Sequence, residues 1–224
     1  MIGTWSEGWC EKTGANHVLF KDRIHAATLL AEKIAAHPRT NLRILGLARG
    51  GVVTASVIAG KLSVPFDVLV IKKLSGPGNP EFAIGAVTQD GVSLVEWNVA
   101  QRTGADESYV TREIDRLTRE IRVQTRLYRK LKKPFVIEGA NVILVDDGAA
   151  TGKTLETAVR WAKKKKARTI VVGTPVASKE AVMMLAPEVD ELIVCHEAAS
   201  LEAVSDYYQS FPQITDEEVI AMLT

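Results

Sequence analysis

The chain has 224 residues, of which 46% are hydrophobic and 25% charged, and its 28 basic side chains nearly balance 27 acidic ones. This composition excludes disordered, collagen-like and coiled-coil proteins, and a net charge of +1 provides no global field that would attract nucleic acid or an acidic membrane. Cys10 and Cys195 are too few for a disulfide framework, and no apolar run resembles a signal peptide or approaches the ~20 residues of a membrane span. We therefore expect a cytoplasmic protein without a membrane or nucleic-acid partner.

The first part of the chain alternates between helix and strand patterns. Apolar residues at helical spacing predict a helix over residues 22–36. Short apolar runs at 42–47 and 66–71 predict buried strands, with a helix over 52–62 between them. The Gly- and Pro-rich residues 75–80 predict a flexible loop without regular structure.

The middle of the chain combines a hairpin signal with a long helix. Strand patterns at 83–88 and 92–97 flank Gln89-Asp90-Gly91, which predicts a β-hairpin. A stripe of apolar residues predicts the longest helix over 105–131. The later elements predicted are strands at 141–145, 169–173 and 191–195 and helices at 153–165, 179–185 and 216–223. This rhythm predicts an α/β fold, a mostly parallel open sheet with helices on both faces.

We expect a single domain over residues 1–224, because no linker or internal repeat divides the chain. Its core would cover about residues 40–197. Residues 74–97 would form a flexible lid and hairpin on that core. Residues 1–20 and 198–224 would lie at the periphery and supply a small hood.

The segment with the most chemical information is residues 141–154. Here an apolar strand leads into Asp146 and Asp147, then into a turn of small residues and the start of a helix. Open α/β sheets bind ligands at the carboxyl ends of strands, and small residues let backbone N–H groups approach a phosphate at a helix N-terminus. Adjacent carboxylates would repel that phosphate, but they accept hydrogen bonds from sugar hydroxyls and suit Mg²⁺. The combination predicts a sugar phosphate site.

Two other interpretations of this segment are less favoured. Gly152-Lys153-Thr154 looks like the end of a Walker nucleotide loop, but that motif has four residues between its glycines, whereas Gly148 and Gly152 enclose three. A correct count would place Asp147 inside the phosphate nest, where its charge is wrong. A plain strand–turn–helix corner gives no reason for the small and hydroxylated residues that follow the acids.

Residues 142–154 resemble the phosphoribosyl pyrophosphate (PRPP) motif of the type I phosphoribosyltransferases, an apolar strand, two acids and a small-residue loop ending in Thr-Gly-Lys-Thr. The resemblance implies that Asp146 and Asp147 hold the ribose 2′- and 3′-hydroxyls, and that residues 149–154 bind the 5-phosphate. The loop residues that it assigns to PRPP binding are Gly148, Ala149, Ala150, Thr151, Gly152, Lys153 and Thr154. Gly148 and Ala149 depart from the bulkier aliphatic residues often found there.

Three other segments strengthen the resemblance. Arg49-Gly50-Gly51 directly follows the predicted 42–47 strand, where this family places its pyrophosphate loop, and arginine offers a fork of donors for phosphate. At the end of the next predicted strand, two lysines match the family's basic residue that approaches the pyrophosphate. The Gly/Pro-rich loop after them corresponds to a mobile lid. The catalytic residues implied are Arg49, Lys72, Lys73, Asp146 and Asp147, with Arg49, Gly50 and Gly51 also assigned to PRPP binding.

Segments such as Gly78-Asn79-Pro80-Glu81 and residues 208–219 resemble a microbial phosphoribosyltransferase subfamily whose acceptor is undefined. The resemblance implies PRPP-dependent transfer of a phosphoribosyl group to a nucleobase-like or other nitrogen acceptor, with release of pyrophosphate. It implies a homodimer and Mg²⁺ carried mainly by PRPP and water. Relatives that act on 6-oxopurines have an Asp where this chain has Ala150, which disfavours those acceptors. The acceptor is expected near residues 196–200.

Two alternative functions remain open at this point. A regulator on the same fold would bind PRPP or a nucleotide without turnover. The run Lys163–Lys166 is a candidate nucleic-acid contact, although lysines are favoured at the end of a helix and a solvated face explains them more simply.

Overall fold

The computed structural model describes residues 12–13, 17–18, 20–38, 40–130, 133 and 135–224, so Cys10 lies outside the described residues. The described helices are α1 (Arg23–Ile34), α2 (Gly50–Leu62), α3 (Trp97–Arg102), α4 (Glu107–Arg129), α5 (Lys153–Lys164), α6 (Lys179–Leu185) and α7 (Asp216–Leu223), with 3-10 helices η1 (Ala186–Glu188) and η2 (Val204–Tyr207). The described strands are β1 (Lys12–Thr13), β2 (His17–Val18), β3 (Leu42–Leu47), β4 (Phe66–Leu69), β5 (Ile71–Gly76), β6 (Asn79–Thr88), β7 (Ser93–Val95), β8 (Asn141–Val145), β9 (Thr169–Ser178) and β10 (Glu191–Ala198). Within these described ranges, no helix combines the length and the apolarity needed to cross a bilayer.

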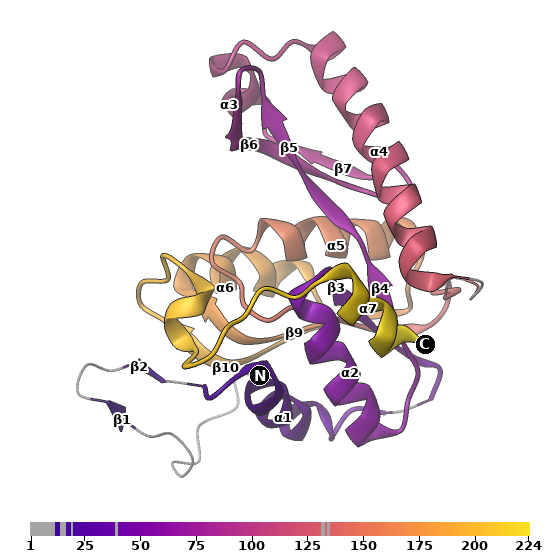
Figure 1. The fold of residues 1–224 in the computed structure, drawn as a ribbon, viewed down its shortest axis with the longest axis vertical. Helices are drawn as coiled ribbons and strands as arrows, with labels where there is room; N and C mark the ends of the chain where they lie inside the picture. The colour runs from indigo at the N-terminus through magenta and orange to yellow at the C-terminus, as the bar shows by residue number, and fades with distance from the viewer. Residues whose placement is uncertain (1–11, 14–16, 19, 39, 131–132, 134) are drawn as a thin grey trace.

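Five parallel strands form the central sheet in the order β10-β9-β8-β3-β4. The chain passes from β3 through α2 to β4 on one side, and from β8 through α5 and α6 to β9 and β10 on the other. Right-handed crossovers therefore place α2 on one face and α5 and α6 on the opposite face, as Figure 1 shows. The predicted α/β fold is confirmed, and its winding reverses between β3 and β8, the position where open sheets bind ligands.

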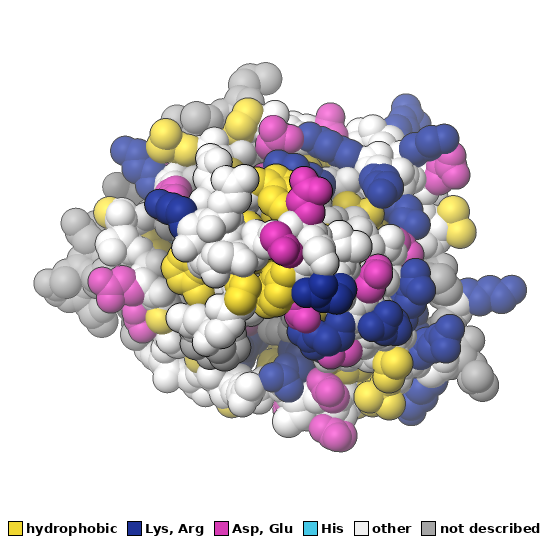
Figure 2. Space-filling model, turned by 90° about the horizontal axis from the view of Figure 1, so that it is seen from above, with side chains coloured by type: hydrophobic (Ala, Val, Ile, Leu, Met, Phe, Trp, Pro, Cys, Tyr) yellow, Lys and Arg dark blue, Asp and Glu magenta, His cyan; other side chains and the backbone are white. Residues whose placement is uncertain are grey.

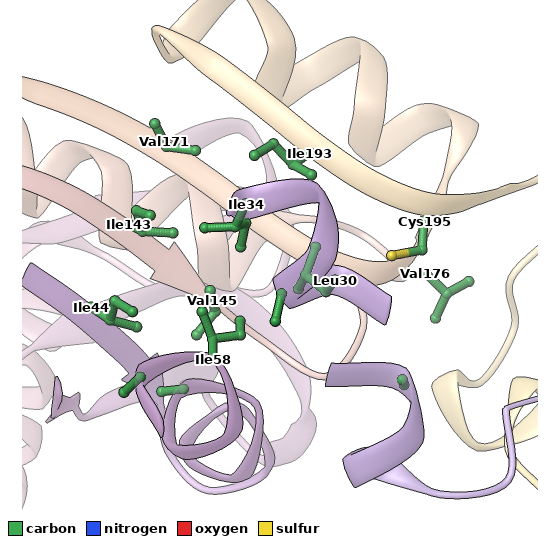
Figure 3. Packing of buried hydrophobic residues seen from close by; sticks show 14 of the residues in the cluster. Leu30, Ile34, Ile44, Ile58, Ile143, Val145, Val171, Val176, Ile193 and Cys195 are labelled. Carbon is green, nitrogen blue, oxygen red and sulfur yellow. The ribbon is translucent and has the colours of Figure 1, made fainter. Parts of the chain in front are cut away.

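The central strands feed a hydrophobic core on each side of the sheet. Ile143 of β8 belongs to the core that includes Ile34 of α1 and Ile58 of α2, shown in Figure 3. The next residue, Leu144, belongs to the opposite core, with Trp161 of α5. Successive strand side chains point to opposite faces, so a strand buried on both faces needs an unbroken apolar run. This requirement explains why the sequence pattern located β8 without error.

The antiparallel strands β5, β6 and β7, which we call the flap, stand above the central sheet beside α4 (Figure 1). One face of the flap packs against α4 in a third core. The predicted hairpin is confirmed, because β6 and β7 pair antiparallel around Gln89-Asp90-Gly91. Asp90 accepts a hydrogen bond from the indole nitrogen of Trp161 at 3.0 Å and pairs with Lys165 at 2.9 Å. These contacts anchor the flap on α5.

The prediction that residues 75–80 lack regular structure was wrong. Strand β5 continues to Gly76 and β6 begins at Asn79, and these two residues pair across an irregular register. Only Pro77 and Gly78 turn the chain, and Gly78 has the positive φ of 73° that such a turn requires. Glycine and proline mark tight turns as well as long loops, so their density alone did not distinguish a hairpin tip from a loop.

The strand predicted over residues 92–97 is shorter than expected. It ends at Val95, and Trp97 begins helix α3. The long predicted helix is α4, whose buried face includes Val110, Leu117 and Ile121 from the predicted apolar stripe.

Candidate functional site

Two loops meet at the carboxyl edge of the central sheet, where the winding reverses. The β3–α2 loop leads into Gly50 and Gly51, the first residues of α2, and the β8–α5 loop begins with Asp146 and Asp147. A Cβ built on Gly50 would overlap the Asp147 carboxylate, and one built on Gly51 would lie 2.9 Å from Cα of Asp146. Glycine at both positions therefore lets the first loop lie directly against the acid pair. The structure brings together these two groups of predicted residues.

The β8–α5 loop presents a run of backbone N–H groups at the start of α5. Among the described residues, we find no hydrogen-bond acceptor for the N–H groups of residues 150–155, and Gly152, the N-cap, provides no side-chain cap. The first N–H groups of a helix have no intrahelical acceptor, so this end of α5 is suited to an anion. Ala149 differs, because its buried N–H donates to the carbonyl oxygen of Val176 at 2.9 Å. The potential phosphate cradle thus begins at Ala150.

The two adjacent acids have different surroundings. Nε of Arg23 donates to Oδ2 of Asp147 at 2.6 Å, and only 8% and 14% of the two side chains are exposed. The backbone N–H of Asp147 donates to Oδ1 of Asp146 at 2.9 Å. Burial, and next the charge of Asp147, raise the pKa of Asp146 well above its usual range. The pair therefore holds a proton more readily than two solvated carboxylates would.

The C-terminal segment after β10 closes over this acid pair. Nη1 of Arg23 donates to the carbonyl oxygen of Pro212 at 2.6 Å, and the guanidinium carbon lies 3.5 Å from the ring centroid of Phe211. The hydroxyl of Tyr208 donates to the backbone oxygen of Asp147 at 2.6 Å, and burial raises the pKa of that phenol. Both ends of the ion pair are thus fixed by residues far from them in the sequence.

Arg23, Tyr208 and Phe211 were not predicted from the sequence as site residues. One signal was available for Arg23, which is the first residue of α1. A cation at a helix N-terminus is opposed by the helix dipole, and α1 has no acidic residue in its first turn, although its N-cap residue is Asp22. This unfavourable position was a weak indication that Arg23 has a partner elsewhere in the fold.

Arg49 lies at the edge of the site. It is the N-cap residue of α2, and the Ala48–Arg49 peptide bond is cis. Its guanidinium is 3.8 Å from a carboxylate oxygen of Asp216 at the start of α7, and 37% of its side chain is exposed. This loose pairing leaves the guanidinium accessible to an anionic ligand.

The prediction that Lys72 and Lys73 end a strand of the central sheet was wrong. Strand β4 ends at Leu69, and both lysines lie inside β5 of the flap, because the chain leaves the sheet after pairing with β3. Lys72 pairs with Glu120 of α4 at 2.9 Å. Lys73 is exposed on the opposite face of β5. Ile71 is on this same face and packs against the core that contains Trp161 of α5. Only Lys73 therefore lies on the side of the β8–α5 loop.

Lys153, the first residue of α5, forms an ion pair with Glu96 next to the flap. Its ammonium thus joins the loop helix to the flap. Thr151 is exposed and Thr154 is half-buried, so both hydroxyls are accessible beside the loop amides.

The lysine run at the end of α5 is involved in ion pairs. Lys163 pairs with Glu188 at 2.7 Å, Lys165 with Asp90, and Lys166 with Glu138 at 3.7 Å. Figure 2, which views the flap side, shows Lys and Arg side chains gathered over the side of that face where α4 lies.

Comparison with known proteins agrees with this geometry. A family model described as the phosphoribosyl transferase domain matches residues 20–196. Two Mycobacterium tuberculosis proteins, from strains H37Rv and CDC 1551, are each named "Putative phosphoribosyl transferase" and are 33% identical over 205 residues, which cover 92% of this chain. The chain spans about half the length of these curated relatives, 46%.

Solved structures show the same architecture. The crystal structure of the protein TT1426 from Thermus thermophilus is 40% identical, with a TM-score of 0.78, and the match covers 92% of this chain and 98% of that one. A hypothetical protein from Neisseria gonorrhoeae, solved with bound ppGpp, is 15% identical with a TM-score of 0.51 over 92% of this chain and 98% of its own, and so shares the fold alone.

The family model covers most of the chain, and it includes both loops that meet at the switch point. The resemblance first indicated by residues 142–154 is therefore confirmed. The chain belongs to the phosphoribosyl transferase domain family and has the type I phosphoribosyltransferase fold.

Proposed function

We propose that this protein transfers the 5-phosphoribosyl group of PRPP to a nitrogen acceptor and releases pyrophosphate. One observation carries the proposal: the N–H groups of residues 150–155, without acceptors among the described residues, lie beside the carboxylates of Asp146 and Asp147 at the sheet's switch point. Amides at a helix N-terminus suit the 5-phosphate, and carboxylates suit the ribose hydroxyls.

The pyrophosphate is assigned to the β3–α2 loop. Gly50 and Gly51 begin α2 there, so the positive end of the helix dipole lies beside the acid pair. We assign to the pyrophosphate two accessible cations, Arg49 at the start of α2 and Lys73 on the exposed face of β5. Together they would neutralise charge that builds up on the leaving group.

In the reaction, the bond between ribose C1 and the pyrophosphate oxygen breaks and a bond from the acceptor nitrogen to C1 forms. The acceptor's proton passes to solvent or to the pyrophosphate. Charge develops as an oxocarbenium ion on the sugar and as negative charge on the pyrophosphate. Catalysis would come from orientation of the sugar by the acid pair and from electrostatic stabilisation of the leaving group by Arg49 and Lys73.

Water must be kept from PRPP during transfer, and we assign this role to the flap. The tip of the flap is the turn at Pro77 and Gly78. The ion pair between Lys153 and Glu96 joins the first residue of α5 to the residue that follows β7 of the flap. Closure of residues 74–82 over the ligand would exclude water.

Mg²⁺ fits this site as an ion that enters with the substrate. The described residues provide no group of three or more His, Cys, Asp or Glu side chains arranged for a metal. The pyrophosphate oxygens and water would hold the ion, with the oxygens of Asp146 and Asp147 nearby, and it would supply further charge neutralisation. The proposal also includes a homodimer. It includes an acceptor other than a 6-oxopurine, because Ala150 stands where relatives that act on 6-oxopurines have an Asp.

The test is release of pyrophosphate from PRPP and Mg²⁺ across a panel of nucleobases and simpler amines, alongside calorimetric PRPP binding. Acceptor-dependent release supports the proposal. Binding of PRPP without release for any acceptor would instead support a regulator that senses PRPP. Absence of PRPP binding would contradict both functions.

A further inference from the structure

The Arg23–Asp147 ion pair has the features of a support for the sugar site rather than of an isolated surface contact. The two residues are 124 positions apart, and the pair is almost fully buried. Arg23 engages Oδ2 of Asp147 and leaves the other carboxylate oxygen outside the ion pair.

Arg23 is itself held in one orientation. Phe211 stacks on its guanidinium at 3.5 Å and Pro212 accepts from Nη1 at 2.6 Å, so a residue of α1 is clamped by the C-terminal segment. A planar guanidinium with its donors directed in this way fixes the rotation of a carboxylate more strictly than an ammonium can.

Asp147 needs such a partner because of its neighbour. Asp146 is beside it, and burial, followed by the charge of Asp147, raises the pKa of Asp146. Without the Arg23 hydrogen bond, the Asp147 carboxylate would be free to rotate, and it would cease to be a fixed acceptor for a sugar hydroxyl.

We infer that Arg23 is a positioning residue for sugar recognition: together with Phe211 and Pro212 it holds the Asp147 carboxylate in a fixed orientation toward the ribose hydroxyls. This inference rests on the proposed function, because it assumes that the acid pair binds ribose. It adds α1 and the C-terminal segment to the site, although neither contains a ligand contact in the proposal above.

The test compares binding of ribose 5-phosphate with binding of methyl phosphate, which keeps the phosphate and lacks the sugar. In wild type, the calorimetric affinity for ribose 5-phosphate divided by that for methyl phosphate gives the contribution of the sugar, and we call this quotient the ratio. Arg23→Met should reduce this ratio by about tenfold or more, because hydrogen bonds to a charged group are lost, while methyl phosphate affinity stays the same. Arg23→Lys should recover only part of the ratio.

Arg129→Met is the matched control. Arg129 forms an equally buried ion pair with Asp67 at 2.8 Å, between α4 and β4. This variant should lose comparable stability but keep the wild-type ratio. Should Arg23→Met fail to fold, Phe211→Leu decides instead, since it removes the stacked ring and leaves both charges in place.

The outcomes separate the two proposals. If wild type binds methyl phosphate and ribose 5-phosphate equally, the sugar site itself is wrong. If wild type favours ribose 5-phosphate, and Arg23→Met or Phe211→Leu retains the full ratio, Arg23 has only a structural role and the inference is overturned. A ratio that falls equally in Arg129→Met would also overturn it.

Discussion

The carboxylate of Asp147 lies directly against Cα of Gly50, so closely that any Cβ at position 50 would overlap it. The contact joins the two loops that we assign to pyrophosphate and to ribose. A side chain at position 50 must displace either the acid or the start of α2.

Gly50→Ala is therefore expected to weaken PRPP binding on the order of 10- to 100-fold, because a shift of about 1 Å in a positioning group has effects of this size. Gly60→Ala is the control within the same helix, since a Cβ there meets no atom within 4 Å. The control should bind PRPP normally and be more stable by about 0.5–1 kcal/mol. Equal PRPP affinity of the two variants would show that the Gly50–Asp147 contact does not belong to the ligand site.

The raised pKa of Asp146 predicts a pH-dependent stability difference. Between the unfolded pKa of about 3.9 and the higher native pKa, the folded state binds more protons, so the free energy of unfolding falls as the pH rises through this window. Asp146→Asn removes this loss. The variant should match wild type at low pH and become progressively more stable than wild type toward neutral pH, while its PRPP affinity declines.

Urea denaturation of wild type and Asp146→Asn at a series of pH values measures this difference. A stability difference that is constant with pH, or that has the opposite sign, would contradict the assigned direction.

The buried ion pair predicts strong coupling between its two partners. Arg23→Met or Asp147→Asn alone leaves an uncompensated polar or charged group next to Phe211 and Tyr208, and each should cost about 3–5 kcal/mol of unfolding free energy. The double variant should lose markedly less than the sum. Additive losses in denaturation experiments would indicate that the two side chains act independently.

The two flap lysines predict a separation of roles. Lys73→Met should weaken PRPP binding and reduce its dependence on salt concentration, because an accessible cation near the pyrophosphate is removed. Lys72→Met serves as the control, since Lys72 is paired with Glu120 on the α4 side. Binding measured from low to high salt should change little in Lys72→Met; a larger effect there than in Lys73→Met would reverse our assignment of the two faces.

Much of the central sheet could be predicted from the sequence because its strands are buried on both faces. Residues 142–145 form an uninterrupted apolar run, and the acids that follow mark the end of the strand. The flap was harder to predict, since β5 follows β4 almost without a break and the flap's tip shares glycine and proline with true loops. Lys72 and Lys73 were misplaced for the same reason, because one apolar run covered two strands that belong to different sheets.

The candidate site could be predicted only where its residues are local in sequence. Asp146, Asp147 and the small-residue loop form one continuous motif, whose chemistry is readable without a fold. Arg23 reaches the Asp147 carboxylate from near the start of the chain, and Phe211, near its end, stacks on the Arg23 guanidinium; only the packing of α1 against the C-terminal segment brings them together.

The most direct test of the account is a crystal structure of the protein grown with PRPP and Mg²⁺. We predict that the 5-phosphate oxygens lie within hydrogen-bond distance of backbone N–H groups among residues 150–154, and that the ribose hydroxyls reach the carboxylates of Asp146 and Asp147. A phosphate bound elsewhere on the molecule, with the acid pair turned away from the sugar, would contradict the account.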